Sequence, residues 1–195
     1  MWVLLVGCAP GAFTEEEAHA AFEAVTSVNE HVYAEIWART QPLDALDTDT
    51  AGASAKSMQW HTGADGGSFD GTLEGPGSWS GAVALDGTYG LTQVNGDDWA
   101  YVWDMGATYA DVAYGDLTLD GTVAWDIEAT YGVSTFTHTS AVVGELVGGG
   151  AATGTGTIDT KTRVTLSGGR YLVTTQGTVG GFDVSRTYDA TGFGL

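Results

Sequence analysis

The chain has few of the residues from which disulfides, zinc sites and nucleic-acid surfaces are built. Its 195 residues include one cysteine, so no internal disulfide can form and zinc sites made from paired cysteines are ruled out. Six Lys and Arg stand against 25 Asp and Glu, which gives a formal net charge of −19. The electric field of this negative charge repels the phosphate backbones of nucleic acids and the surfaces of anionic lipid membranes. We therefore expect no nucleic-acid partner, and any membrane attachment has to be covalent and apolar.

The motifs of common enzymes and metal sites are also missing. Trp79 takes the central place between Gly77 and Gly81, where a Gly-x-Ser-x-Gly elbow would carry its nucleophile. The chain has no phosphate-binding loop motif and no His-Glu-x-x-His. His19 and His31 fall on one predicted helix but are separated by ~18 Å of helical rise, too far to share a metal. We expect no catalytic residue, no metal and no cofactor, and the protein is predicted not to be an enzyme.

Two weaker patterns keep alternatives open. The segment 47–52 begins like a calcium-binding loop, but Ala51 and Met58 stand at two of the ligand positions. The enzymatic alternative is a hydrolase that uses His61 or His138 with a nearby carboxylate. Convergence of these histidines with acidic side chains in one cleft would favour that alternative, and dispersed side chains would remove it.

Glycine and regularly spaced hydrophobic residues are abundant. Thirty glycines accompany three prolines, and hydrophobic residues make up 43% of the chain. This composition is typical of a β-rich protein with many turns and a real hydrophobic core. The length favours one globular domain, which we expect over residues 14–195.

One amphipathic helix is predicted near the N-terminus, over residues 14–39. Thr14 and Glu17 have the spacing of a capping box, and Pro42 disfavours helical turns beyond Arg39. Hydrophobic side chains recur at helical spacing and form one stripe, made of Ala18, Ala21, Phe22, Val25, Val28, Val32, Tyr33 and Ile36. The opposite face carries Glu16, Glu23 and Glu30. A polar connector is expected over residues 40–56.

From residue 57 to residue 195 the hydrophobic pattern changes to the period of two that is typical of strands. Hairpin turns are predicted at Ser167–Gly169 and Asn95–Asp98. Asp-Gly pairs at Asp70, Asp86 and Asp120 are instead predicted to lie inside continuous strands, because the flanking hydrophobic residues keep their parity through the glycine. An inward glycine allows a sharp bend. The predicted fold is mainly β, a strongly curved antiparallel sheet (roll or barrel-like) of about eight to ten strands packed against the one N-terminal amphipathic helix.

Five residues are candidates for ligand binding: Asn29, Trp99, Tyr101, Trp103 and Trp125. Asn29 lies inside the hydrophobic stripe of the helix. It points into a ligand cavity or, as we favour, forms a hydrogen bond to a carbonyl of a sheet edge or loop. The aromatic residues share one face of their strands. They could stack on a sugar or line an apolar pocket, but we favour a core face that the helix covers.

A short hydrophobic run at the N-terminus ends in the single cysteine, in the order Leu5-Val6-Gly7-Cys8. This stretch resembles the lipobox of bacterial lipoproteins. The resemblance implies that residues 1–8 are a signal peptide with its lipobox, that Cys8 is lipidated, and that residues 9–13 form a tether. It also implies export and anchoring to the cell envelope. Since Ala9 follows the cysteine, the outer membrane is favoured in a Gram-negative cell.

These observations together predict an exported, lipid-anchored envelope protein that acts by non-covalent binding or as a structural component. The sharper form of this prediction is a carrier of an apolar ligand, and the ligand classes considered are a small apolar molecule and a carbohydrate. The expected partner is the membrane, reached through the lipid at Cys8, and no protein partner is indicated. Besides the hydrolase, the alternative is an outer-membrane β-barrel.

Overall fold

A computed structural model describes residues 11–40, 58–63, 65–95, 98–132, 136–167 and 169–190 of the protein. Within these ranges the chain forms one helix, α1 (Glu15–Thr40), followed by strands. The strands are β1 (Gln59–Gly63), β2 (Gly66–Glu74), β3 (Ser80–Asn95), β4 (Asp98–Tyr114), β5 (Leu117–Tyr131), β6 (Phe136–Gly150), β7 (Gly154–Ser167), β8 (Arg170–Val179), β9 (Phe182–Asp183) and β10 (Arg186–Ala190). The predicted connector over 40–56 and the candidate calcium loop at 47–52 lie outside the described residues, apart from Thr40, which ends the helix.

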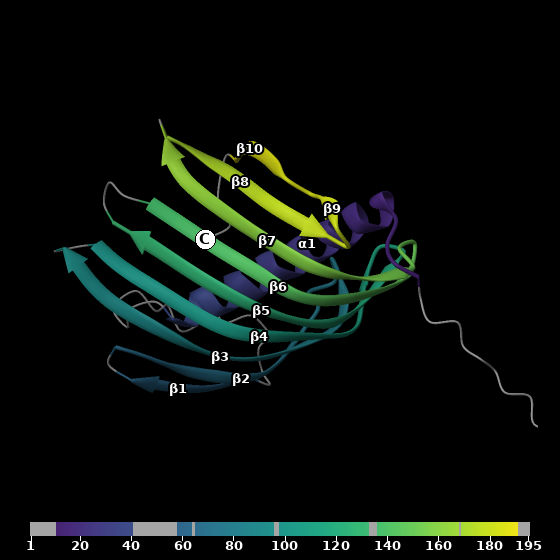
Figure 1. The fold of residues 1–195 in the computed structure, drawn as a ribbon. Helices are drawn as coiled ribbons and strands as arrows, with labels where there is room; N and C mark the ends of the chain where they lie inside the picture. The colour runs from purple at the N-terminus through teal and green to yellow at the C-terminus, as the bar shows by residue number, and fades with distance from the viewer. Residues whose placement is uncertain are drawn as a thin grey trace, which may run out of the picture.

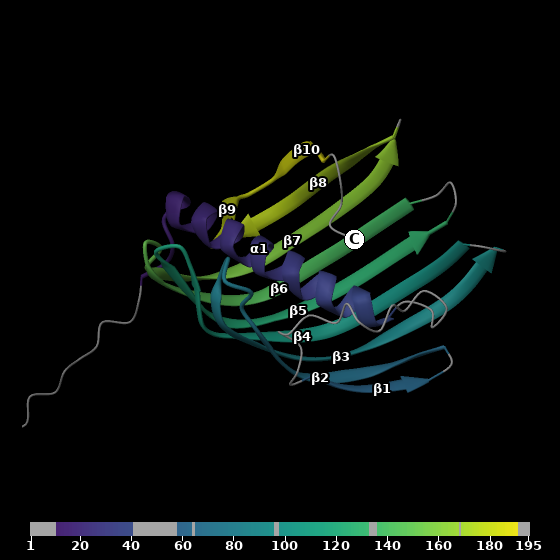
Figure 2. The same cartoon turned by 180° about the vertical axis from the view of Figure 1, so that it is seen from behind.

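The strands form one 10-stranded antiparallel sheet in the order β1-β2-β3-β4-β5-β6-β7-β8-β10, with β9 also paired to β8. The sheet curls around α1, which crosses its concave side diagonally (Figures 1 and 2). This confirms the predicted mainly β fold with a strongly curved antiparallel sheet and one N-terminal helix. The sheet is not closed, because β1 and β10 end the order and do not pair with each other in the described chain. The curved sheet is therefore an open roll.

The helix begins with the predicted capping box. The backbone N–H of Thr14 donates to Glu17 Oε2 at 2.8 Å, and the N–H of Glu17 donates to Thr14 Oγ1 at 3.4 Å. These bonds satisfy donors that the first helical turn leaves unpaired. The hydrogen bonds from Thr14 hold the pKa of the Glu17 carboxyl below its ordinary value. The helix ends at Thr40, one residue beyond the predicted end.

The predicted stripe of α1 is the face that meets the sheet. All eight predicted stripe residues are buried, and Ala24, Asn29, Trp37 and Thr40 are buried with them. Glu16, Glu23 and Glu30 are exposed, as predicted. Since this buried face meets the concave side of the sheet, one core lies between helix and strands.

Glycines bend the strands over the helix. Gly121 lies inside β5 with a φ of +137°, and a Cβ there would stand 2.2 Å from the carbonyl oxygen of Glu145 on the neighbouring strand. Opposite it, β4 has a register shift between Tyr109 and Val112, where Asp111 has a φ of 50°. The Asp111 N–H donates to Asp120 Oδ1 at 2.9 Å. The bulge and the glycine together increase the local bend.

The predictions for the Asp-Gly pairs and for the two hairpins are confirmed. Each pair lies inside a continuous strand: Asp70 in β2, Asp86 in β3 and Asp120 in β5. The two hairpins pair Asn95 with Asp98 and Ser167 with Arg170.

The residues just before the helix correct one expectation. Residues 11–13 do not form a free tether, because they run beside β7. The Thr155 N–H donates to the Gly11 carbonyl at 2.8 Å, the Phe13 N–H donates to the Thr155 carbonyl at 3.3 Å, and Ala12 pairs with Thr155 in a parallel bridge. Phe13 is 3% exposed and belongs to the core. These residues are part of the globular domain, and the lipobox with Cys8 lies outside the described residues.

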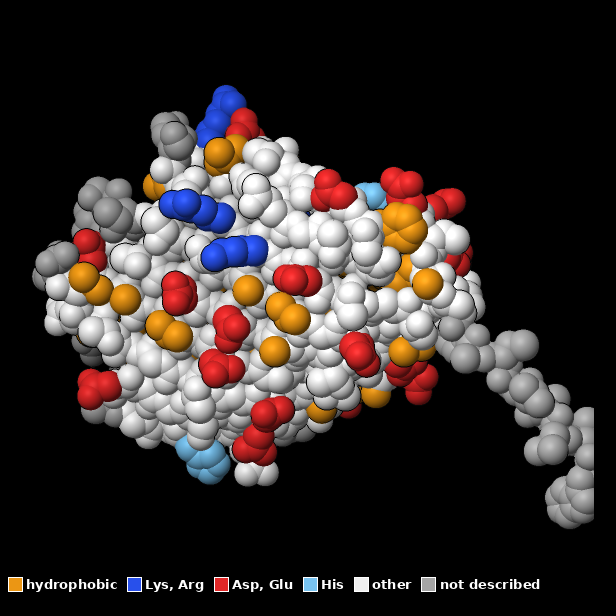
Figure 3. All heavy atoms as spheres, in the orientation of Figure 1, with side chains coloured by type: hydrophobic (Ala, Val, Ile, Leu, Met, Phe, Trp, Pro, Cys, Tyr) orange, Lys and Arg blue, Asp and Glu red, His pale blue; other side chains and the backbone are white. Residues whose placement is uncertain are grey.

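The convex side of the sheet is polar and acidic. Figure 3 shows acidic side chains spread over this face, with hydrophobic side chains scattered between them. Asp104 and Asp126 are exposed and stand directly opposite each other on β4 and β5. Over the described residues, no helix combines the length and hydrophobicity needed to cross a membrane.

Candidate ligand cavity between the helix and the sheet

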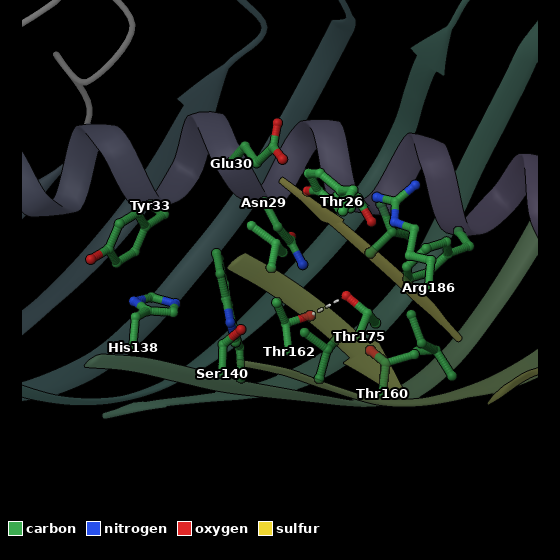
Figure 4. Close-up of a pocket in the computed structure, with 17 residues that line it drawn as sticks. Thr26, Asn29, Glu30, Tyr33, His138, Ser140, Thr160, Thr162, Thr175 and Arg186 are labelled. Carbon is green, nitrogen blue, oxygen red and sulfur yellow. Dashed lines mark hydrogen bonds between the residues drawn. The ribbon is translucent and has the colours of Figure 1, made fainter. Parts of the chain in front are cut away.

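A cavity of about 90 Å³ lies between α1 and strands β5, β6, β7, β8 and β10. A single water needs only about 10–15 Å³, so this space holds several waters or a small organic molecule. Its polar lining consists of Thr26, Asn29, Glu30, Tyr33, His138, Ser140, Thr160, Thr162, Thr175 and Arg186 (Figure 4). The rest of the lining is hydrophobic or aromatic and consists of Phe22, Val25, Trp125, Val142, Ile158, Val173 and Tyr188.

The polar lining comes from strand positions where a core would ordinarily place hydrophobic residues. Thr160 and Thr162 follow Ile158 on the inner face of β7, and Thr175 follows Val173 on β8. Thr162 and Thr175 share a hydrogen bond of 2.9 Å between their hydroxyl oxygens. The inner faces of β4 and β5 instead carry large hydrophobic residues that pack under the helix. The cavity therefore lies where the inner face of the sheet changes from hydrophobic to polar.

One cation, Arg186, borders the cavity on β10. Its guanidinium group lies 4.9 Å from the ring centre of Phe22 and 5.3 Å from that of Tyr188, within the range of cation–π attraction. It also forms an ion pair with Glu23 of the helix. Glu30 borders the same space and is exposed, so the cavity reaches the surface here. Partial burial raises the pKa of the Glu30 carboxyl, while the charge of Arg186 acts in the opposite direction.

The inner end of the cavity is uncharged at neutral pH. His138 on β6 is 4% exposed, and its ring centre lies 5.0 Å from that of Tyr33 in an edge-on arrangement. Burial lowers the pKa of His138 to about 4, so its imidazole is neutral at pH 7. The hydroxyl oxygens of Tyr33 and Tyr131 are 2.5 Å apart in a hydrogen bond, and burial raises the pKa of Tyr131 to about 12.

Asn29 was expected either to point into a ligand cavity or to form a hydrogen bond within the protein, and the structure shows both. It lines the cavity, and its Oδ1 accepts a 2.6 Å hydrogen bond from the Tyr109 hydroxyl. The partner is a side chain on the inner face of β4 rather than the edge or loop carbonyl that we favoured. Trp125 also lines the cavity. The structure thus brings two of the five candidate binding residues together.

The other three candidates belong to the core. Tyr101 is 4% exposed and Trp103 is 1% exposed, and both lie under Trp37 of the helix at ring-centre distances of 4.8 and 5.8 Å. Trp99 is half-buried and packs against the same core. None of the three is among the residues described as lining the cavity. Tyr101 and Trp103 are therefore core residues, as the favoured interpretation expects, and Trp99 packs against that core.

The histidines named for a hydrolase are dispersed. His61 is exposed on the edge strand β1, whereas His138 is buried on β6 with β2, β3, β4 and β5 between them. His31 packs edge-on against Trp79, with 5.8 Å between ring centres. In the part of the chain that the structure describes, no group of three or more His, Cys, Asp or Glu could hold a metal ion. The two histidines named for a hydrolase therefore do not meet in one cleft.

Several lining residues were missed in the sequence. Ser140, Thr160, Thr162 and Thr175 have the inward parity of their strands, so a polar residue at an inward position was the signal that could have found them. Arg186 gave no such signal, because its partners Phe22 and Glu23 are far away in the chain. Comparisons with known protein families, with curated proteins and with solved structures give no match to this chain.

Proposed function

We propose that this protein is an exported, lipid-anchored envelope protein that binds a small uncharged molecule in the cavity under α1. The observation that carries the proposal is the set of neutral hydrogen-bonding side chains around a space of about 90 Å³ inside the domain. Inward polar groups cost free energy unless they find partners, and empty space in a core costs free energy as well. A ligand that fills the space and pairs with these groups removes both costs.

The charges near the cavity support an uncharged ligand. Arg186 already pairs with Glu23, and Glu30 adds a negative charge on the same side. The inner lining offers neutral Ser, Thr, Asn, Trp and a neutral His138. A buried ionic group without a counter-ion is strongly disfavoured. The lining combines polar side chains with hydrophobic and aromatic ones. A molecule with one polar group and one hydrophobic ring therefore suits it better than a purely apolar one.

Binding is tested with fluorinated probes observed by ¹⁹F NMR. The probes are 4-fluoroacetophenone, 2-deoxy-2-fluoroglucose, fluorobenzene and the anion 4-fluorobenzoate, which matches the ketone closely in shape. We expect the ketone or the sugar to bind and the anion not to bind. Equal or tighter binding of 4-fluorobenzoate contradicts an uncharged ligand, and binding of fluorobenzene alone favours the apolar carrier.

A variant that fills the cavity locates the site. Ser140→Leu places a large side chain in the cavity, whereas Thr139→Leu places the same side chain on the opposite face of β6. Binding should be lost in the first variant and kept in the second. If none of the uncharged probes binds, or if both variants bind them equally well, the cavity is not a binding site and a structural role remains.

The anchor is part of the same proposal and rests on the resemblance of Leu5-Val6-Gly7-Cys8 to a lipobox. Since Gly11 is fixed to β7, three residue steps from Cys8 span at most about 11 Å. A lipid at Cys8 would therefore hold the domain close to the membrane surface despite the repulsion from anionic lipid.

Two measurements test the anchor in a bacterium that processes lipoproteins. Intact mass should show a mature protein that begins at an acylated Cys8. The Cys8→Ser variant should move from the membrane fraction to the soluble fraction. An unmodified thiol with Met1 still present would refute the anchor and would leave the proposal for the cavity untouched.

A further inference from the structure

One donor in the cavity wall has no acceptor. Trp125 lies on the inner face of β5 and is 4% exposed, and it lines the cavity. Its indole Nε1–H is buried and has no hydrogen-bond partner among the described residues. An indole nitrogen can only donate, so no rearrangement of its own proton satisfies it. A buried donor without an acceptor is costly and calls for an explanation.

Neighbouring polar groups of the cavity are already paired within the protein. Asn29 accepts from Tyr109, and Thr162 and Thr175 are bonded to each other. The Nε of Arg186 is also unpaired, but it belongs to a guanidinium group that an ion pair with Glu23 holds at the mouth. The Trp125 N–H thus belongs to a residue that lines the cavity, and the described protein offers it no acceptor.

An unpaired indole alone does not indicate a site, and the same structure supplies the comparison. Trp79 and Trp103 also have buried Nε1–H groups without partners. Both lie in the packed core and do not line the cavity that the structure describes. What distinguishes Trp125 from these two residues is that its side chain lines the cavity.

We infer that the Trp125 Nε1–H donates to an acceptor oxygen of the ligand and so selects a carbonyl, ether or hydroxyl compound over a hydrocarbon of the same shape. This inference rests on the proposed function and narrows its ligand class. The hydrophobic part of the ligand lies against the apolar lining, which includes Val142 on the neighbouring strand and Ile158 on β7. Trp125 and Val142 are direct partners in the β5–β6 register, so one residue pair contacts both parts of the ligand.

Two probes that differ only in the acceptor test the inference. They are 4-fluoroacetophenone and 4-fluoro-α-methylstyrene, in which a methylene group replaces the carbonyl oxygen. A net hydrogen bond between neutral groups corresponds to about two- to tenfold in affinity. We expect the wild-type protein to bind the ketone tighter by that factor in a ¹⁹F NMR titration.

Two matched variants assign the effect to one indole. Trp125→Phe keeps an aromatic ring but removes the N–H, and it should bind ketone and alkene equally well. Trp103→Phe removes an equally unpaired N–H from the core and should keep the preference. If both probes bind equally well to the wild-type protein, or if Trp125→Phe keeps the preference, the inference is overturned while the proposed function stands. If neither probe binds the wild-type protein, the inference is overturned, and the proposed function is then decided by the sugar and fluorobenzene probes.

A second measurement covers the case in which Trp125→Phe does not fold. In protein labelled with ¹⁵N-tryptophan, the indole resonance of Trp125 is assigned through NOEs to the Val142 methyl groups. That resonance should move downfield when the ketone is added and should not do so when the alkene is added. The same response to both probes, or no response to the ketone, overturns the inference.

Discussion

The hydrogen bond between Tyr109 and Asn29 joins the sheet to the helix at the edge of the cavity. The two oxygens are 2.6 Å apart, Tyr109 is 2% exposed and Asn29 is 6% exposed. Burial raises the pKa of Tyr109, so its hydroxyl is a neutral donor at pH 7. The bond is therefore an isolated neutral pair whose energy a double-mutant cycle can measure.

We predict a marked asymmetry between the single and double variants. Tyr109→Phe leaves the amide oxygen of Asn29 without its donor and should lower the free energy of unfolding by about 1–2 kcal/mol. Asn29→Leu leaves a fully buried hydroxyl unpaired and should cost about 1–3 kcal/mol. The double variant replaces both partners with hydrocarbon and should cost less than the sum of the two by about 1 kcal/mol or more.

Urea unfolding at pH 7, followed by tryptophan fluorescence and by circular dichroism, measures these energies. The slope of the free energy against urea should be the same in all four proteins, because the surface exposed on unfolding hardly changes. If the two single effects add to within about 0.5 kcal/mol, the groups are not coupled. That result would refute the placement of Asn29 against β4.

Three further predictions concern the cap, the buried histidine and a bend. Thr14→Ala should lower the free energy of unfolding by about 1 kcal/mol at pH 7. The loss should shrink in a pH series as the pH falls through the lowered folded pKa of Glu17, because protonation of that carboxylate removes its part of the cap. His138 has a folded pKa of about 4 against 6.5 for the free group, so acidification from pH 6.5 to 4 should destabilise the protein by up to about 3 kcal/mol. His138→Gln should reduce that slope, and an unchanged slope would refute the assignment. Gly121→Ala should lower the free energy of unfolding by about 2 kcal/mol or more, because Gly121 has a positive φ and a carbonyl oxygen lies close to it. Gly90→Ala, where the added methyl group meets open space, should change that free energy by less than about 1 kcal/mol. Equal shifts in the melting temperature of the two variants would contradict this reasoning.

Local features of the sequence were sufficient to predict the helix and the strand periodicity of the rest of the chain. The capping box and the spacing of hydrophobic residues placed the helix to within one residue at its end. Strand parity placed Gly121 inside β5 rather than in a hairpin. Each of these signals lies within one turn of helix or a few strand positions, where neighbouring side chains alone decide the backbone.

Tertiary structure decided which distant residues meet. Asn29 and Tyr109 are 80 residues apart, and Arg186 and Glu23 are 163 apart, so neither pairing leaves a local trace. The docking of residues 11–13 beside β7 likewise depends on a free backbone position far along the chain. The sequence showed polar residues at the inward-facing positions of β6, β7 and β8. Only the curvature of the sheet and the crossing of α1 bring those residues together around one cavity. The physical reason is that periodicity reports which face a side chain occupies, whereas long-range register and bending determine what lies opposite that face.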